Sequence, residues 1–130
     1  MKRLLLVVGS FVGLLLVAGV VGWLWLDYQT SPKSWPSEEF SSDAWKVAAP
    51  EERYVFYRDL ADSGMMEGST KAELIRLLGE PSWADPGGTY MTYLVKEREP
   101  EEWSFNAIYL LDIRLDPATG EVRRYFIRGD

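Results

Sequence analysis

The side chains best suited to chemistry in this sequence are carboxylates in its second half. They are Glu97, Glu99, Glu101, Glu102, Asp112 and Asp116. A glycosidase needs two carboxylates that a rigid scaffold holds across a cleft. The glutamates instead surround Pro100 in a stretch that also contains Lys96 and Arg98. We therefore interpret this stretch as a solvated, charged loop rather than as an acid–base pair.

Other routes to catalysis lack their usual partners. The chain has no histidine and no cysteine, so the commonest general base and the only thiol nucleophile are missing. No Gly-x-Ser-x-Gly motif surrounds any serine. Asp116, Thr119 and Glu121 could offer oxygens to calcium, but the spacing and central glycine of a calcium loop are absent, so a turn is expected. The sequence predicts no catalytic residue, no metal ligand and no cofactor.

Charge argues against nucleic acid as a partner. The chain of 130 residues carries a formal net charge of −6. Lys2 and Arg3 precede a long apolar run, and the segment after that run holds 12 basic against 20 acidic residues, a net charge of −8. Such a domain repels polyanions at long range.

The apolar run, residues 4–26, contains one residue, Ser10, that is neither apolar, aromatic nor glycine. As a helix it would extend roughly 35 Å, enough to cross a bilayer core of about 30 Å. Lys2 and Arg3 before it, and Trp23, Trp25 and Tyr28 at its far end, predict a cytoplasmic N-terminus and an extracytoplasmic remainder.

We expect residues 1–28 to be an uncleaved signal anchor. The alternative is a cleaved signal peptide, but the run is longer than usual and no Ala-x-Ala comes after it. Val20 stands where a bacterial lipoprotein would carry its lipidated cysteine, so lipidation there is excluded. Gly9 and Gly13 form a Gly-x-x-x-Gly pair that could support a weak homodimer.

Residues 29–49 are rich in serine and contain Pro32 and Pro36, which predicts an extended tether. Trp35, Phe40 and Trp45 are large for a spacer. Trp45 is expected to pack on the edge of the domain, and a partner-docking role for the three rings is the alternative.

Residues 50–130 predict one α+β domain. A helix should begin near Pro50 and end at Ser63 and Gly64. A second should begin after Thr70, which forms a capping box with Glu73, and should stop at a left-handed Gly79 before Pro81. Strands are expected at residues 89–96, 104–115 and 121–128. The predicted fold places two short helices on one face of a three-stranded antiparallel sheet.

The capped helix with its Leu77-Leu78-Gly79-Glu80-Pro81 exit, followed by strands ending in Leu115-Asp116 and Gly120-Glu121-Val122, resembles the SmpA/OmlA (BamE-like) family over roughly residues 64–128. The resemblance implies a small helix–helix–sheet fold, shared by the β-lactamase inhibitor protein, in an envelope protein that binds other proteins. Ser69 stands where the family usually has a hydrophobic residue. Val20 stands where the outer-membrane members carry their lipidated cysteine, so this chain cannot be lipidated there.

Binding is the function that remains. Trp83 and Trp103 lie on predicted loops, where large aromatic residues often anchor a partner or plug the end of a small sandwich. Tyr90, Tyr93, Tyr109 and Tyr125 could populate a sheet face that two helices leave uncovered. We predict a membrane-anchored, extracytoplasmic interaction module of the bacterial cell envelope that binds another envelope protein and serves envelope assembly or maintenance. The alternatives are an inhibitor-like domain that blocks an extracytoplasmic enzyme and a domain that binds a small ligand or lipid.

Overall fold

The structure, a computed structural model, describes residues 2–130 except the side chains of residues 2, 4–6 and 26–30. Met1 and the side chains of Lys2 and Tyr28, to which the predicted topology appealed, lie outside the described residues. The chain divides into two compact units, one ending at Ser34 and one comprising Trp35–Asp130.

The first unit is a long helix, α1 (Lys2–Thr30), followed by a 3₁₀ turn, η1 (Pro32–Ser34). Within α1, Val7–Trp25 is long and apolar enough to cross a membrane, and its side chains are exposed. A signal sequence has the same properties, so the segment is a candidate span or signal. Nothing in the described residues lies within 4 Å of a Cβ built on Gly9 or Gly13. The proposed homodimer stays a prediction.

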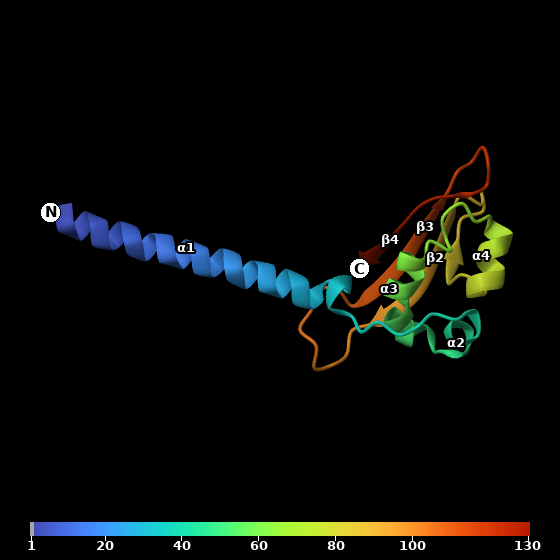
Figure 1. The fold of residues 1–130 in the computed structure, drawn as a ribbon, viewed down its shortest axis with the longest axis horizontal. Coiled ribbons are helices and arrows are strands. Elements are labelled where there is room, and N and C mark those ends of the chain that lie inside the picture. Colours follow the sequence, from blue (N-terminus) through green and yellow to red (C-terminus); the bar gives the residue numbers. More distant parts are fainter. Residues whose placement is uncertain (1) are drawn as a thin grey trace. The chain divides into compact units, whose positions relative to one another are not determined.

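The second unit combines short helices with one antiparallel sheet (Figure 1). The helical elements are α2 (Ser42–Val47), η2 (Pro50–Glu52), α3 (Tyr54–Ser63) and α4 (Lys71–Leu78). The strands, in sheet order, are β1 (Trp83–Ala84), β2 (Tyr90–Glu97), β3 (Ile108–Leu115) and β4 (Val122–Gly129). The predicted α+β class is confirmed. The sheet has four strands, whereas three were predicted. The sequence did not reveal β1 because two residues are too few to produce an alternating pattern.

One face of the sheet, here called the covered face, packs against the helices. Its strands contribute Met91, Tyr93, Leu111 and Ile113, each fully buried. The helices contribute Trp45 from α2, Phe56 and Leu60 from α3, and Leu74 and Leu78 from α4. Three α-helices therefore build this layer, one more than predicted.

The predicted tether requires correction beyond residue 34. Trp35 and Phe40 are each 7% exposed, and Trp45 is fully buried, so all three belong to the core. The Phe40 N–H donates to Asp59 Oδ2 at 2.8 Å. The three rings are thus neither spacer nor exposed docking site, and the compact unit begins fifteen residues earlier than residue 50.

Helix α4 begins and ends close to where its sequence signals place it. The Thr70 side chain accepts the Glu73 N–H at 3.3 Å, which is the N-terminal cap. Gly79 follows the helix with φ 78° and ψ −168°. This positive φ was expected, but the ψ is not that of the left-handed helical region. The conformation belongs to a region that essentially only glycine adopts.

A bulge in β2 reverses the side-chain alternation near its end. The register passes from Leu94 opposite Leu110 to Lys96 opposite Tyr109, which leaves Val95 as the extra residue. Lys96 therefore joins Tyr109 on the covered face and is 5% exposed. Its Nζ lies 5.1 Å from the Tyr54 ring centroid and 2.6 Å from Glu102 Oε2.

Candidate partner-binding face

The second face of the sheet, here called the open face, carries no packed helix in the unit Trp35–Asp130, since the buried residues of α2, α3 and α4 all belong to the core on the other side. Strand register assigns its residues, because side chains alternate between faces. They are Trp83 of β1; Tyr90, Thr92 and Leu94 of β2; Leu110, Asp112 and Arg114 of β3; and Arg124, Phe126 and Arg128 of β4.

An aromatic pair forms one end of the open face. The Trp83 ring is 53% exposed and meets the Tyr90 ring edge-on, with 5.0 Å between their centroids. Asp85 orders the turn between their strands, because its Oδ1 accepts the backbone N–H groups of Thr89 at 2.9 Å and Tyr90 at 2.8 Å. The structure therefore brings two of the predicted binding residues, Trp83 and Tyr90, together next to a turn that Asp85 holds in place.

A buried carboxylate lies at the centre of the open face. Asp112 is fully buried, and its Oδ1 accepts hydrogen bonds from the Tyr90 hydroxyl at 3.1 Å and the Thr92 hydroxyl at 2.9 Å. Arg128 Nη1 lies 3.4 Å from Asp112 Oδ2 and donates to the Tyr90 hydroxyl at 3.2 Å. Desolvation acts to lower the pKa of Arg128, but Asp112, Tyr90 and Asp130 together raise it above its ordinary value. This network fixes Tyr90 and Arg128 in place.

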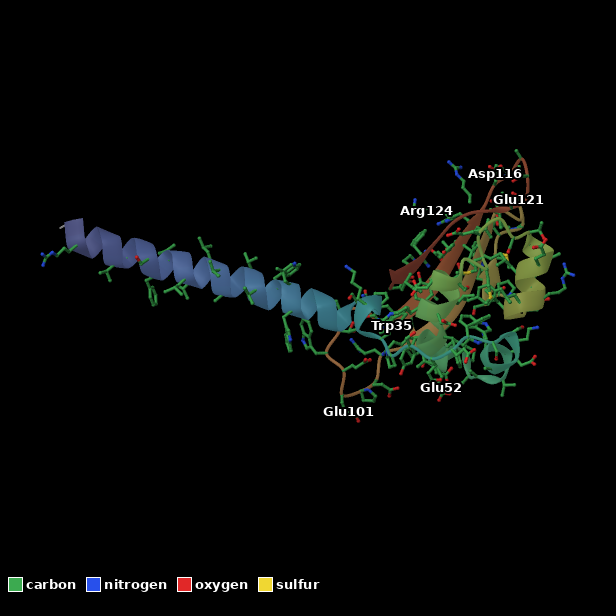
Figure 2. All side chains as sticks on the ribbon, viewed as in Figure 1. Trp35, Glu52, Glu101, Asp116, Glu121 and Arg124 are labelled. Carbon is green, nitrogen blue, oxygen red and sulfur yellow. The ribbon has the colours of Figure 1, made fainter. Side chains whose placement is uncertain are left out.

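Two further arginines lie beside that network. Arg114 stacks on the Tyr90 ring, with its Cζ 3.8 Å from the centroid, and Arg124 stacks on Phe126 at 4.6 Å. They border an open groove of about 550 Å³ that Thr89, Leu115, Pro117 and Arg123 also line. Figure 2 shows Arg124 near the turn that contains Asp116 and Glu121.

The other predicted tyrosines do not lie on the open face. Tyr93 is fully buried on the covered face, where its hydroxyl donates to the Gly79 carbonyl at 2.8 Å and burial raises its pKa. Tyr109, 5% exposed, packs edge-on against Trp35. Tyr125 packs on the same core, and its hydroxyl donates to the Ala61 carbonyl at 3.3 Å. These three rings build the core.

Trp103 occupies a separate place in the loop between β2 and β3. It is 59% exposed and meets Phe105, itself 78% exposed, with 4.7 Å between ring centroids. The same loop carries Glu101, which Figure 2 shows away from the labelled Asp116 and Glu121. Trp103 lies outside the strands whose register defines the open face.

Two glutamates at this loop, Glu97 and Glu99, line an open groove. The groove measures about 730 Å³, and its lining includes Glu38, Glu51, Glu52, Glu97 and Glu99. All five are solvent-exposed. Among the described residues, no group of three or more His, Cys, Asp or Glu is placed to hold a metal ion.

Sequence reasoning missed the basic residues of the open face. Along β3 and β4, residues of the open face alternate with core residues, so the shared face could have been found from period-two spacing. The residues missed are Arg114 of β3 and Arg124, Phe126 and Arg128 of β4. Asp112 was considered only as a catalytic carboxylate. Its central position became visible only with the strand register.

Comparison of the chain with protein-family models, curated proteins and solved structures yields no match in any of the three. The resemblance to the BamE-like family over residues 64–128 thus stays a prediction.

Proposed function

We propose that the chain is a membrane-anchored, extracytoplasmic module of the bacterial cell envelope that binds another envelope protein through the open face. The observation that supports this most directly is the exposed Trp83 ring held against Tyr90 on a sheet face without a packed helix. Large aromatic residues with one fixed geometry lose little conformational entropy on binding, and they are common anchors of protein interfaces.

Membrane attachment would come from residues 4–26, with the N-terminus in the cytoplasm and the compact unit in the periplasm or outside the cell. The apolar helix Val7–Trp25 supports attachment, and Lys2 and Arg3 support the orientation. A cleavable signal sequence would also deliver the compact unit across the membrane. Protease accessibility of the compact unit in sealed spheroplasts tests the orientation, and the mass of the mature chain tests retention.

Site-specific photo-cross-linking tests the binding face. A photoreactive phenylalanine analogue at Trp83 in the full chain should give one discrete adduct with an envelope protein in intact membranes. The same analogue at Ala72, exposed on α4, should not. Substitution of Tyr90 by Ser in the Trp83-labelled chain should reduce the adduct at least fivefold. Equal adducts from both positions would contradict docking through the open face.

An inhibitor-like domain would use the same surface and differs in the identity of its partner. If the adduct contains a hydrolase whose activity falls on binding, the chain would be an inhibitor of that enzyme rather than a module of envelope assembly or maintenance.

A further inference from the structure

Arg114 and Arg124 are direct cross-strand partners on the open face. The register of β3 and β4 places them opposite each other, and neighbouring strands lie about 4.8 Å apart. Like charges directly opposite each other destabilise a sheet. In the part of the chain that the structure describes, no carboxylate lies within ion-pair distance of either guanidinium. The fold therefore tolerates two unneutralised positive charges side by side.

Stacking holds both guanidinium groups in defined positions. Arg114 lies over the Tyr90 ring and Arg124 over the Phe126 ring, at 3.8 and 4.6 Å from the centroids. A stacked guanidinium uses its flat face, so its in-plane N–H donors remain available for a carboxylate. The Tyr90 ring is itself fixed by the bond from its hydroxyl to Asp112. The two donors are thus ordered before any ligand binds.

The surroundings combine further positive charge with apolar walls. Arg123, Leu115 and Pro117 line the same groove. Asp112, two residues before Arg114 on the same face, is engaged by the hydroxyls of Tyr90 and Thr92 and by Arg128. Asp116, two residues after Arg114, is engaged in the turn, where its Oδ1 accepts the Ala118 N–H at 2.7 Å. The segment after the apolar run carries a net charge of −8, so this basic groove is opposite in sign to the domain.

We propose that Arg114 and Arg124 form a docking site for an acidic segment of the partner protein, with a glutamate or aspartate carboxylate gripped between the two guanidinium groups. This proposal rests on the proposed function and specifies its partner's chemistry. Carboxylates bind arginine through paired, charge-assisted hydrogen bonds.

The free edge of β4 favours an extended peptide as the occupant. Within the described residues, β4 pairs with β3, and its other edge meets the chain only at its start, through the Thr70–Glu121 bridge and the bond from Val122 N–H to Ser69 O at 2.8 Å. The rest of that edge presents backbone donors and acceptors to which an extended segment can pair. Arg124, Phe126 and Arg128 then face alternate side chains of the added strand.

Nucleic acid and anionic membranes fit the site less well. Both are extended arrays of negative charge, which a domain of net charge −8 repels outside the groove. A short acidic segment presents few charges, and its apolar residues can contact Phe126.

The test uses the full chain in nanodiscs of zwitterionic lipid and three capped probe peptides. In the acidic probe, every second residue is threonine, and the residues between the threonines are glutamate, valine and glutamate in that order. The second probe carries glutamine, and the third carries lysine, in place of both glutamates. We expect the acidic probe to shift the side-chain Nε–H NMR signals of Arg114 and Arg124, but not that of Arg76 on α4. We expect the glutamine probe to bind at least tenfold more weakly.

Charge reversal separates recognition from a structural role. The double variant Arg114→Glu, Arg124→Glu should lose at least tenfold in affinity for the acidic probe and should gain affinity for the lysine probe. Arg114→Gln, Arg124→Gln should bind neither charged probe well, and it provides a second variant if the first fails to fold. Arg76→Glu should leave the binding of all three probes unchanged.

Three outcomes would overturn the proposal. Equal binding of the acidic and glutamine probes would show that charge is not recognised. Shifts of the Arg114 and Arg124 signals with phosphatidylglycerol vesicles but not with peptide would assign the groove to lipid. No shift with either peptide or vesicles would indicate that the arginines bind no ligand and only prevent pairing at the exposed sheet edge. Each result is independent of Trp83 cross-linking, so this proposal can fail while the proposed function stands.

Discussion

The indole N–H of Trp45 donates to the Leu78 carbonyl at 3.0 Å, and both residues are fully buried. The bond joins α2 to the last turn of α4 across 33 residues of sequence. It satisfies a carbonyl that the end of a helix leaves without an intrahelical partner. A segment with the composition of a linker is thereby built into the core.

Substitution of Trp45 tests this role. Trp45→Phe should keep most of the packing but leave the buried Leu78 carbonyl unpaired, which costs about 1–3 kcal/mol. Trp45→Ala adds a cavity and should cost about 3–5 kcal/mol. The free energy of unfolding in urea measures both. Val47→Ala, at an 86% exposed position of the same helix, is the matched control and should change stability little. Costs below about 1 kcal/mol for Trp45→Ala would contradict a core role.

The conformation of Gly79 predicts a difference between two glycines. Gly79 has φ 78° and ψ −168°, whereas Gly64, which ends α3, has φ 72° and ψ 9°. Asparagine tolerates the second conformation but not the first. Gly79→Asn should therefore cost about 1–3 kcal/mol, and Gly64→Asn considerably less. A built Cβ meets its nearest atom at 3.8 and 3.9 Å respectively, so space does not separate the two sites. Thermal unfolding of both variants provides the comparison, and equal losses would argue against backbone strain.

The buried carboxylate on the open face predicts a large cost for its removal. Asp112→Ala leaves the hydroxyls of Tyr90 and Thr92 without their acceptor and removes the ion pair with Arg128, which should cost about 1–3 kcal/mol. Asp130, 51% exposed, pairs with the same arginine at 3.2 Å. Asp130→Ala should cost less than about 1 kcal/mol, because exposed ion pairs contribute little. Urea unfolding checks both, and similar effects would refute the central role of Asp112.

The pair of Lys96 and Glu102 predicts a pH dependence on the acid side. Desolvation acts to raise the pKa of Glu102, but hydrogen bonds from Lys96 and the Glu99 N–H lower it overall. Because the folded-state pKa lies below the unfolded one, the stabilisation is present above the unfolded pKa of about 4.3 and is lost as pH falls through the folded pKa. Glu102→Gln should therefore destabilise the domain at neutral pH and progressively less below about pH 4.

Urea unfolding of wild-type and Glu102→Gln chains between about pH 3 and 7 measures this convergence. Glu101→Gln, an exposed neighbour for which the same partners are not observed, is the control and should match the wild type at every pH. A Glu102→Gln deficit that stays constant down to the acid end of this range would contradict the assignment.

Local signals in the sequence were enough to predict an element when its ends are set by its own residues. Thr70, Gly79 and Pro81 mark the ends of α4 by capping and by backbone restriction, which are short-range effects. Trp35 could not be placed in this way, since its serine- and proline-rich neighbours say nothing about contacts with residues far along the chain. Trp45 was expected to pack on the edge of the domain, and it is fully buried in the core. β1 has two residues and leaves no periodic trace.

The open face was anticipated as a surface, but of the four tyrosines expected on it only Tyr90 lies there. Tyr93 and Tyr109 were assigned by residue type, whereas their face depends on register and on the bulge at Val95. Tyr90 and Trp83 do lie there, and the arginines opposite each other emerged only from pairing β3 with β4.

The extra residue at Val95 also affects how the sequence of this chain must be aligned with the sequences of its relatives. Before it, even-numbered positions of β2 point outward, and after it Lys96 points inward. A relative whose strand is regular would need a one-position gap at this point, and an ungapped alignment would pair inward residues with outward ones. Loss of a single codon there would have the same effect on the protein, because it would turn the ammonium group of Lys96 away from the rings of Tyr54 and Tyr109.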